Sequence, residues 1–312
     1  MPDGGCRRLV DLKDGVLAAE VVVLLVGFAY AAFADWKSRE VSDGLWQGMG
    51  VIGVALGFVG AAADGTIAIV MWLVVGAFVL QHLFPWDEWL GSFGESNADL
   101  LEAVIYAVVS AVVLAVAWKF GVGTSGVPVF VLATFATVLF ARGLFELGVL
   151  YGGADAKALM IAGVVVPLFA SPWLPVPPAA SSALAVVPFS VSLLMDAALL
   201  SLAIPIGLAI RNGIRGEFEF PRGFSGYQLD VRELPKHFVW LKDPLLAEEQ
   251  DRDVETSEED RQERERIARD LTARGVERVW VTPQIPFLVL MAAGAVAALL
   301  AGNLVLDLFA IL

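Results

Sequence analysis

The sequence is poor in the residues that usually build cross-linked or reactive centres. Cys6 is the only cysteine, which excludes an intramolecular disulfide and a cysteine-based zinc site. His82 and His237 are the only histidines, which argues against a Ser-His or Cys-His catalytic centre. Positive charge is also scarce. The formal net charge is −13, and because phosphate binding needs a basic face, no nucleic-acid partner is expected.

Long apolar runs dominate the remainder. Of the 312 residues, 58% are hydrophobic and 18% are charged, whereas soluble domains have about 45–50% apolar and about 25% charged residues. A helix needs about 20 apolar residues to cross the hydrocarbon core. The sequence therefore predicts an all-α polytopic membrane bundle of about eight transmembrane helices in the lipid bilayer. The eight runs are Val16–Ala34, Leu45–Ala63, Thr66–Phe84, Leu100–Phe120, Val127–Leu150, Ala158–Ala170, Ser182–Ile210 and Pro286–Leu312.

One segment is different in kind. Residues 211–283 alternate short β-type stretches with a charged run that is expected to form a helix from Ser257 to Arg274 and to stop at Gly275. This predicts a small α+β domain outside the bilayer, inserted before the last helix. We thus expect a membrane bundle over 1–210, a soluble domain over 211–283 and a C-terminal transmembrane helix over 284–312. The expected strands are Tyr227–Leu229, Phe238–Leu241 and Val279–Val281.

Lysine and arginine predict the orientation. With eight spans, the side reached at the end of the first span receives the loops near 35–44, 85–99 and 151–157 and the soluble domain. Few basic residues fall on the other side: Arg7, Arg8, Lys13 and Lys119. Because cytoplasmic loops are enriched in Lys and Arg, the soluble domain is expected to face the cytoplasm from a multi-pass position in the cell membrane. Ala32-Phe33-Ala34 has the form of a signal-peptide cleavage site, but the apolar run before it is longer than usual, so the first span is expected to remain.

Two aspartates are placed in a related way. Asp35 closes the first span and Asp155 opens the sixth, and the four spans between them bring the chain back to the same side. Ionisable groups at a membrane edge are costly and indicate a functional site. Two carboxyls that share a proton are what aspartic proteolysis requires: one takes a proton from water and the other donates to the scissile carbonyl. The alternative reading is that each aspartate merely caps or anchors a helix end.

The segments around these aspartates resemble the signatures of the type IV prepilin peptidase family, more closely its archaeal preflagellin and prepilin branch. Asp35 followed by Arg39 resembles the first signature, with Asp43 where the family often has asparagine. The second resembles a G-x-G-D motif that leads into a helix with a lysine, and Ala154 replaces its last glycine. Its residues here are Gly152, Gly153, Ala154, Asp155 and Lys157.

The resemblance implies an aspartic endopeptidase with Asp35 and Asp155 as catalytic residues and no metal or cofactor. It would remove the short basic leader from prepilin or pre-archaellin precursors at the cytoplasmic face. The family's smaller archaeal members have a six-span plan, to which this chain adds a pair of spans. Because a single cysteine cannot build the zinc segment of bacterial members, no N-methyltransferase activity is expected. Nothing in the sequence indicates the oligomeric state.

The principal alternative is an ion-coupled transporter or channel with the aspartates on the ion path. Asp196 and Pro205 in the seventh span favour it, whereas the edge placement of Asp35 and Asp155 and the absence of an inverted repeat oppose it.

Overall fold

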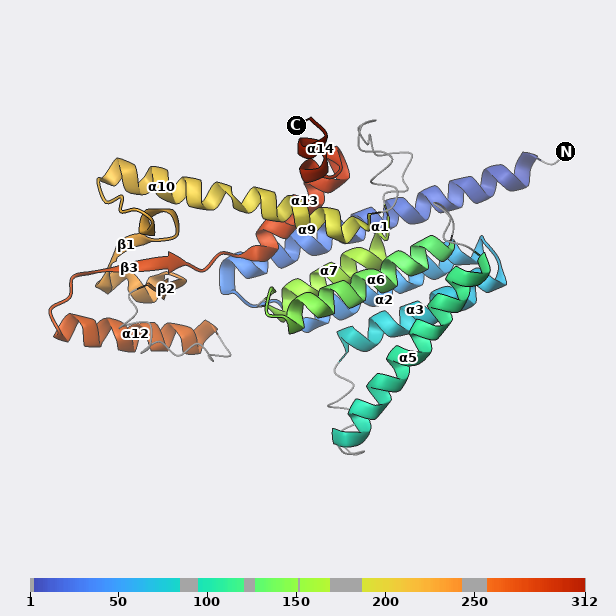
Figure 1. Cartoon of the computed structure of the whole chain (residues 1–312), viewed down its shortest axis with the longest axis horizontal. Helices are drawn as coiled ribbons and strands as arrows, with labels where there is room; N and C mark the ends of the chain where they lie inside the picture. The colour runs from blue at the N-terminus through green and yellow to red at the C-terminus, as the bar shows by residue number, and fades with distance from the viewer. Residues whose placement is uncertain are drawn as a thin grey trace.

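The protein is a helical bundle with a small antiparallel sheet beside one end (Figure 1). The computed structural model describes residues 3–84, 95–120, 127–150, 152–168, 187–242 and 257–311. Helix α1 (Asp3–Ser38) runs along the bundle, and its C-terminal end lies on the side of the sheet. The other described helices of the bundle are α2 (Asp43–Ala62), α3 (Thr66–Leu83), α5 (Glu95–Phe120), α6 (Val127–Glu146), α7 (Gly153–Val165), α9 (Phe189–Ser201), α10 (Ala203–Arg215), α13 (Phe287–Ala301) and α14 (Leu304–Ile311).

Four helical stretches among the described residues are long and apolar enough to cross a membrane, which indicates a multi-pass membrane protein. They are Leu12–Ser38, Asp43–Ala62, Thr66–Leu83 and Phe189–Arg215. Two shorter apolar helices, Val104–Ala115 and Phe287–Ala301, add to them. The seventh predicted span is therefore a long apolar stretch, but it extends to Arg215 and changes from α9 to α10 at Leu202 rather than at Pro205.

The last predicted span is wrong as a single helix. It divides into α13 and α14 at Gly302, whose φ of 86° lies in the left-handed region that favours glycine. Asn303 then accepts a hydrogen bond from the Leu306 N–H at 3.0 Å, and Asp196 on α9 accepts one from the Leu304 N–H at 2.9 Å. These side chains satisfy amides that begin a new helix, so the chain stops and restarts where hydropathy alone predicts continuity.

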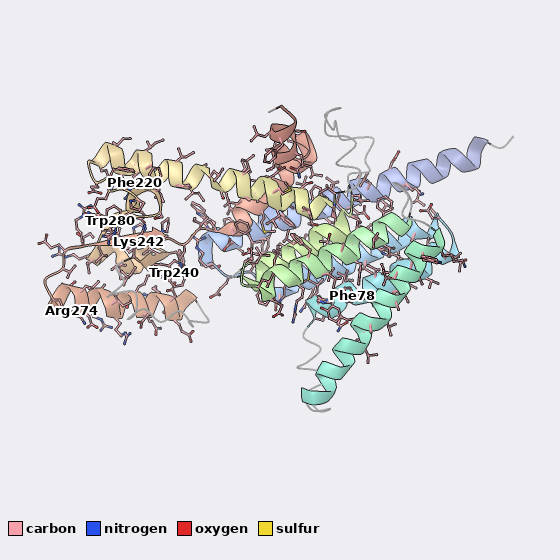
Figure 2. The ribbon with its side chains drawn as sticks, viewed as in Figure 1. Phe78, Phe220, Trp240, Lys242, Arg274 and Trp280 are labelled. Carbon is pink, nitrogen blue, oxygen red and sulfur yellow. The ribbon has the colours of Figure 1, made fainter. Side chains whose placement is uncertain are left out.

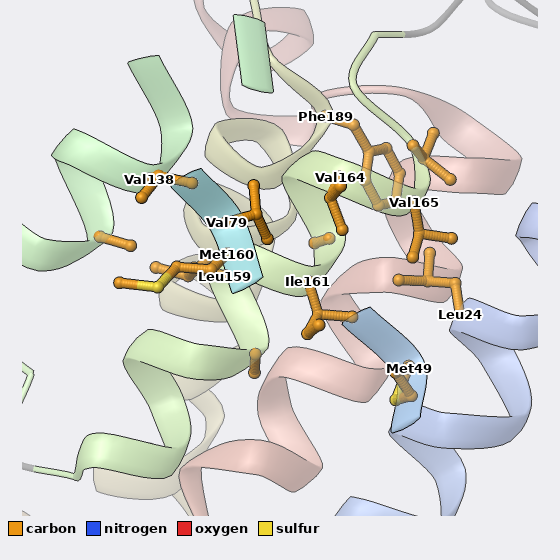
Figure 3. Close-up of a cluster of buried hydrophobic side chains, with 14 of the residues drawn as sticks. Leu24, Met49, Val79, Val138, Leu159, Met160, Ile161, Val164, Val165 and Phe189 are labelled. Atoms are coloured by element: carbon orange, nitrogen blue, oxygen red, sulfur yellow. The ribbon is translucent and has the colours of Figure 1, made fainter. Parts of the chain in front are cut away.

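The sixth predicted span is as short as expected, but α7 begins earlier than predicted, at Gly153, and ends at Val165. It occupies the centre of the bundle. In α7 the side chains from Ala158 to Val165 are all buried. Figure 3 shows Leu159, Ile161 and Val164 of α7 among buried side chains from the neighbouring helices, including Leu24 of α1 and Phe189 of α9. A helix enclosed by protein on all sides need not match the full thickness of the hydrocarbon, and this accounts for its 13 residues.

Helices α9 and α13 pack with their backbones unusually close. A Cβ atom added at Gly294 of α13 would lie 2.6 Å from the carbonyl oxygen of Leu193 and 2.8 Å from the backbone nitrogen of Ala197. Small residues at such crossings allow the close van der Waals packing that holds helices together in lipid. Gly294 thus fixes α13 against α9.

The small domain is a three-stranded antiparallel sheet covered by one charged helix. Strands β1 (Tyr227–Asp230) and β2 (Val239–Leu241) flank the central β3 (Arg278–Pro283), in the order β1-β3-β2. All three strands lie at the predicted positions. Helix α12 (Ser257–Ala273) also agrees with the sequence, and Gly275 follows it with a φ of 76°. Figure 2 shows Trp240, Lys242 and Trp280 of this domain set apart from Phe78 in the bundle.

The domain has its own apolar core, made by alternating strand residues and one face of α12. Val279 and Val281 of β3 are buried together with Leu271 and Ile267 of α12. Two contacts anchor this core to α10. The buried Asn212 side chain donates hydrogen bonds to the carbonyl oxygens of Gly223 and Gly226, at 2.9 Å and 2.8 Å, and the guanidinium of Arg211 stacks over the Tyr227 ring.

Candidate active site

Asp35 lies in the last turn of α1, at the end of the bundle next to the sheet. Its side chain is half-buried, and Oδ2 accepts a hydrogen bond from the backbone N–H of Leu288 at 3.2 Å. Leu288 belongs to the first turn of α13, where the preceding Pro286 offers no side-chain cap. Asp35 therefore caps a helix that begins more than 250 positions later in the chain. The capping role that the sequence left open is real, but the capped helix is α13.

Asp155 lies in the first turn of α7, and its carboxyl folds back over the residue that precedes the helix. A Cβ atom at Gly152 would lie 2.9 Å from Asp155 Oδ2 and 3.3 Å from its Cγ. A Cβ atom added at Gly153 would meet only a ring atom of Phe145, at 4.0 Å, and Gly153 is exposed. Gly152 is thus required by the position of the Asp155 carboxyl, whereas Gly153 is not. Ala154, which replaces the family's last glycine, packs against the apolar core.

The structure brings the two aspartates to the same end of the bundle. Helices α1 and α7 are in contact, and Asp35 lies in the last turn of α1 while Asp155 lies in the first turn of α7. A second contact fixes the same arrangement, because Lys157 Nζ of α7 lies 2.6 Å from Asp43 Oδ1 at the start of α2. Lys157 is three-quarters buried and joins the segment after Asp35 to the segment after Asp155.

Arg39 follows α1 in a left-handed conformation, with a φ of 61° that is uncommon outside glycine. Its backbone N–H donates to the Asp35 carbonyl oxygen at 3.1 Å, and its charge acts on the Asp35 carboxyl. The guanidinium carbon lies 5.0 Å from the centre of the Phe238 ring of the small domain. Among the described residues, Nε and Nη1 of Arg39 are buried without a hydrogen-bond partner. Arg39 therefore contributes charge beside Asp35 and also contacts the small domain.

Phe238 is a part of this arrangement that sequence reasoning missed. A second guanidinium, that of the buried Arg264 on α12, lies 5.3 Å from the same ring, and Arg264 is also paired with Asp260. The backbone carbonyl of Phe238 accepts a hydrogen bond from the Gln284 N–H at 2.9 Å, just before α13. No pattern in the sequence predicts a ring between two arginines that are distant in the chain.

Other predicted side chains have structural partners. Arg142 and Glu146 form the expected ion pair, with 2.7 Å between Nη2 and Oε1. Asp196, the best support for an ion path, caps α14 through the Leu304 N–H, so its burial has a structural explanation. The sequence also predicts a solvated acidic loop on the cytoplasmic side, with Asp87, Glu88, Glu95, Asp99 and Glu102, and of these Asp87 and Glu88 lie outside the described residues. Within the described residues no three His, Cys, Asp or Glu side chains are grouped to hold a metal ion, and metal independence stays a prediction.

Comparison with known proteins bears on the C-terminal part of the chain. None of the curated proteins matches the chain. Residues 220–304 match the family model described as Archaeal Peptidase A24 C-terminus Type II. The matched region contains the three strands, α12 and α13, including Phe238 and the Leu288 N–H that donates to Asp35, but neither aspartate. The chain is therefore a membrane protein related to the archaeal A24 peptidases.

Proposed function

We propose that the protein is a membrane aspartic endopeptidase that removes the short basic leader from prepilin-like or pre-archaellin precursors at the cytoplasmic membrane face. Asp35 and Asp155 are the catalytic residues in this proposal. The proposal rests on the position of the two aspartates at one end of the bundle. The Lys157–Asp43 ion pair and the contact of Asp35 with α13 hold the helices that carry them. The match of residues 220–304 to an A24 peptidase region supports the same reaction class.

The surroundings of the two carboxyls suit different roles. Asp35 Oδ2 already accepts a hydrogen bond from the Leu288 N–H at 3.2 Å, a contact that suits an acceptor oxygen, and Arg39 follows Asp35 by one helical turn. Among the described residues, none donates a hydrogen bond to the Asp155 side chain. We therefore assign Asp35 as the group that removes a proton from the attacking water. Asp155 then donates its proton to the oxygen of the scissile carbonyl.

The proposed step balances as in other aspartic proteases. Water oxygen bonds to the carbonyl carbon, its proton passes to Asp35, and the carbonyl oxygen receives the proton of Asp155. Collapse of the tetrahedral diol breaks the C–N bond: the proton held by Asp35 goes to the leaving amine, and one hydroxyl of the diol returns its proton to Asp155 as the carbonyl re-forms. Both side chains are half-buried, so the site excludes bulk water but stays open to an extended peptide.

The membrane edge suits a precursor whose apolar helix begins just after the bond to be cut. The apolar helix can remain in the bilayer while the leader and the scissile bond reach the carboxyls. The distribution of Lys and Arg predicts that this edge faces the cytoplasm, and this orientation is part of the proposal.

The test is single replacement of each aspartate in a cell that co-expresses a tagged precursor. Asp35→Asn and Asp155→Asn should each abolish the gel-mobility shift of the processed precursor, because asparagine keeps the shape but cannot exchange the proton. Glu146→Gln is the matched control. It changes a carboxyl that is 57% exposed and pairs only with Arg142 among the described residues, and processing should continue. Processing at the parental rate by either asparagine variant would exclude the dyad.

A further inference from the structure

A second site lies at the end of the bundle opposite Asp35. A cavity of about 300 Å³ opens there between the N-terminal half of α1, α2, α3 and α6 and the residues after α7. We propose that it binds an amphiphile with a cationic amine head and an apolar chain. Its lining includes Lys13, Asp14, Glu20, Gly60, Asp64 and Trp72.

Glu20 is the observation that points to a ligand. It lies four positions beyond Val16, the first residue of the apolar run in α1, which is about 6 Å along a helix axis. Its side chain lines the cavity and the residue is only 9% exposed. Within the described part of the chain, no hydrogen bond or ion pair is made to its carboxyl. A carboxyl this deep in a span is costly, and a structural role would supply it with a partner.

The charges that line the cavity leave a negative balance. Lys13 Nζ lies 2.6 Å from Asp64 Oδ1, so these two neutralise each other at the rim. Asp14 and Glu20 remain, and both line the same cavity. A ligand that completes the site therefore carries positive charge, and it places that charge near Glu20.

The rest of the wall is apolar and aromatic, which excludes a bare metal ion as the best-fitting ligand. Gly60 opens one side, because a Cβ atom there would meet only Val16, at 3.9 Å. Trp72 presents its ring while its indole N–H is used by the Val54 carbonyl at 2.9 Å. The volume is at the lower end of the range for small-molecule sites. Aromatic walls beside a carboxylate are the chemistry that binds organic ammonium groups.

The experiment uses the full-length protein in phosphatidylcholine nanodiscs and 10-bromodecylamine as the probe, because bromine quenches tryptophan fluorescence at contact. The quenching measured in the parental protein minus the quenching measured in Trp72→Phe gives the quenching at the cavity. We expect saturable quenching that is at least tenfold weaker in Glu20→Gln. Gly60→Leu, which fills the cavity but keeps the carboxyl, should weaken it equally. Gel filtration and thermal unfolding verify that each variant is folded.

Two results would overturn the proposal. One is an unchanged affinity for the amine in folded Glu20→Gln or Gly60→Leu. The other is saturable quenching of the same affinity by 10-bromodecanol, which has the chain but no charge. The source of the amine is then distinguished with nanodiscs that contain phosphatidylethanolamine. Competition by this lipid identifies a lipid headgroup as the ligand, and its absence identifies a free amphiphilic amine.

Discussion

Replacement of Gly152 by alanine tests whether the Asp155 carboxyl must lie where the structure has it. The new Cβ atom would stand 2.9 Å from Oδ2, whereas ordinary contact begins at 3.4 Å, so the carboxyl must retreat by about 0.5 Å or rotate away. A misplacement of about 1 Å can cost about 10²-fold in rate, so we expect a loss of about tenfold, which is about 1.4 kcal/mol in the activation barrier. The backbone itself is unstrained, since φ is −94°.

The neighbouring glycine provides the matched control. At Gly153 the added methyl group meets only the Phe145 ring at ordinary contact distance, and the position is exposed, so Gly153→Ala should process at the parental rate. Single-turnover cleavage of a tagged precursor by the purified protein, with thermal unfolding alongside, separates rate from stability. The reasoning fails if Gly152→Ala retains the parental rate or if Gly153→Ala loses as much.

Four further predictions follow from contacts in the bundle. Asp35→Ala should lower the unfolding free energy by about 1 kcal/mol more than Asp35→Asn, because asparagine still accepts the Leu288 N–H; equal thermal stabilities in detergent would refute the cap. A double-mutant cycle of Lys157→Ala and Asp43→Ala should give a coupling of about 0.2–1 kcal/mol, and zero coupling would contradict the ion pair. Gly294→Val should prevent recovery of monodisperse protein, because its side chain meets the α9 backbone, and an unchanged melting temperature would speak against that crossing. EDTA should leave precursor cleavage unchanged, and restoration of a lost activity by added metal would indicate a metalloenzyme instead.

Local patterns in the sequence were sufficient for the elements that depend on neighbours in the chain. Short β-type stretches located all three strands, and the charged run that stops at Gly275 located α12. The Arg142–Glu146 pair was also predictable, because residues four apart share a helix face. Because an even number of apolar runs separates Asp35 from Asp155, both could be expected at the same end of the bundle.

Tertiary contacts decided what the sequence could not. The break at Gly302 depends on Asp196, more than 100 positions earlier, and hydropathy does not register such a cap. The short length of α7 was expected from the sequence, but its enclosure by neighbouring helices depends on tertiary packing that a window of apolar residues cannot reveal. The contact between Arg39 and Phe238 joins residues from the two ends of the chain. A signal for Glu20, in contrast, was visible as an acidic residue within an apolar run.

The junction between the sheet and α13 is very short. Gln284, Ile285 and Pro286 alone separate β3 from the helix, and hydrogen bonds tie both ends of this stretch, to Phe238 on one side and to Asp35 on the other. Such a connection has no slack to absorb rotation. A rotation of the sheet would thus be transmitted directly to the start of α13 and to the Asp35 carboxyl that caps it.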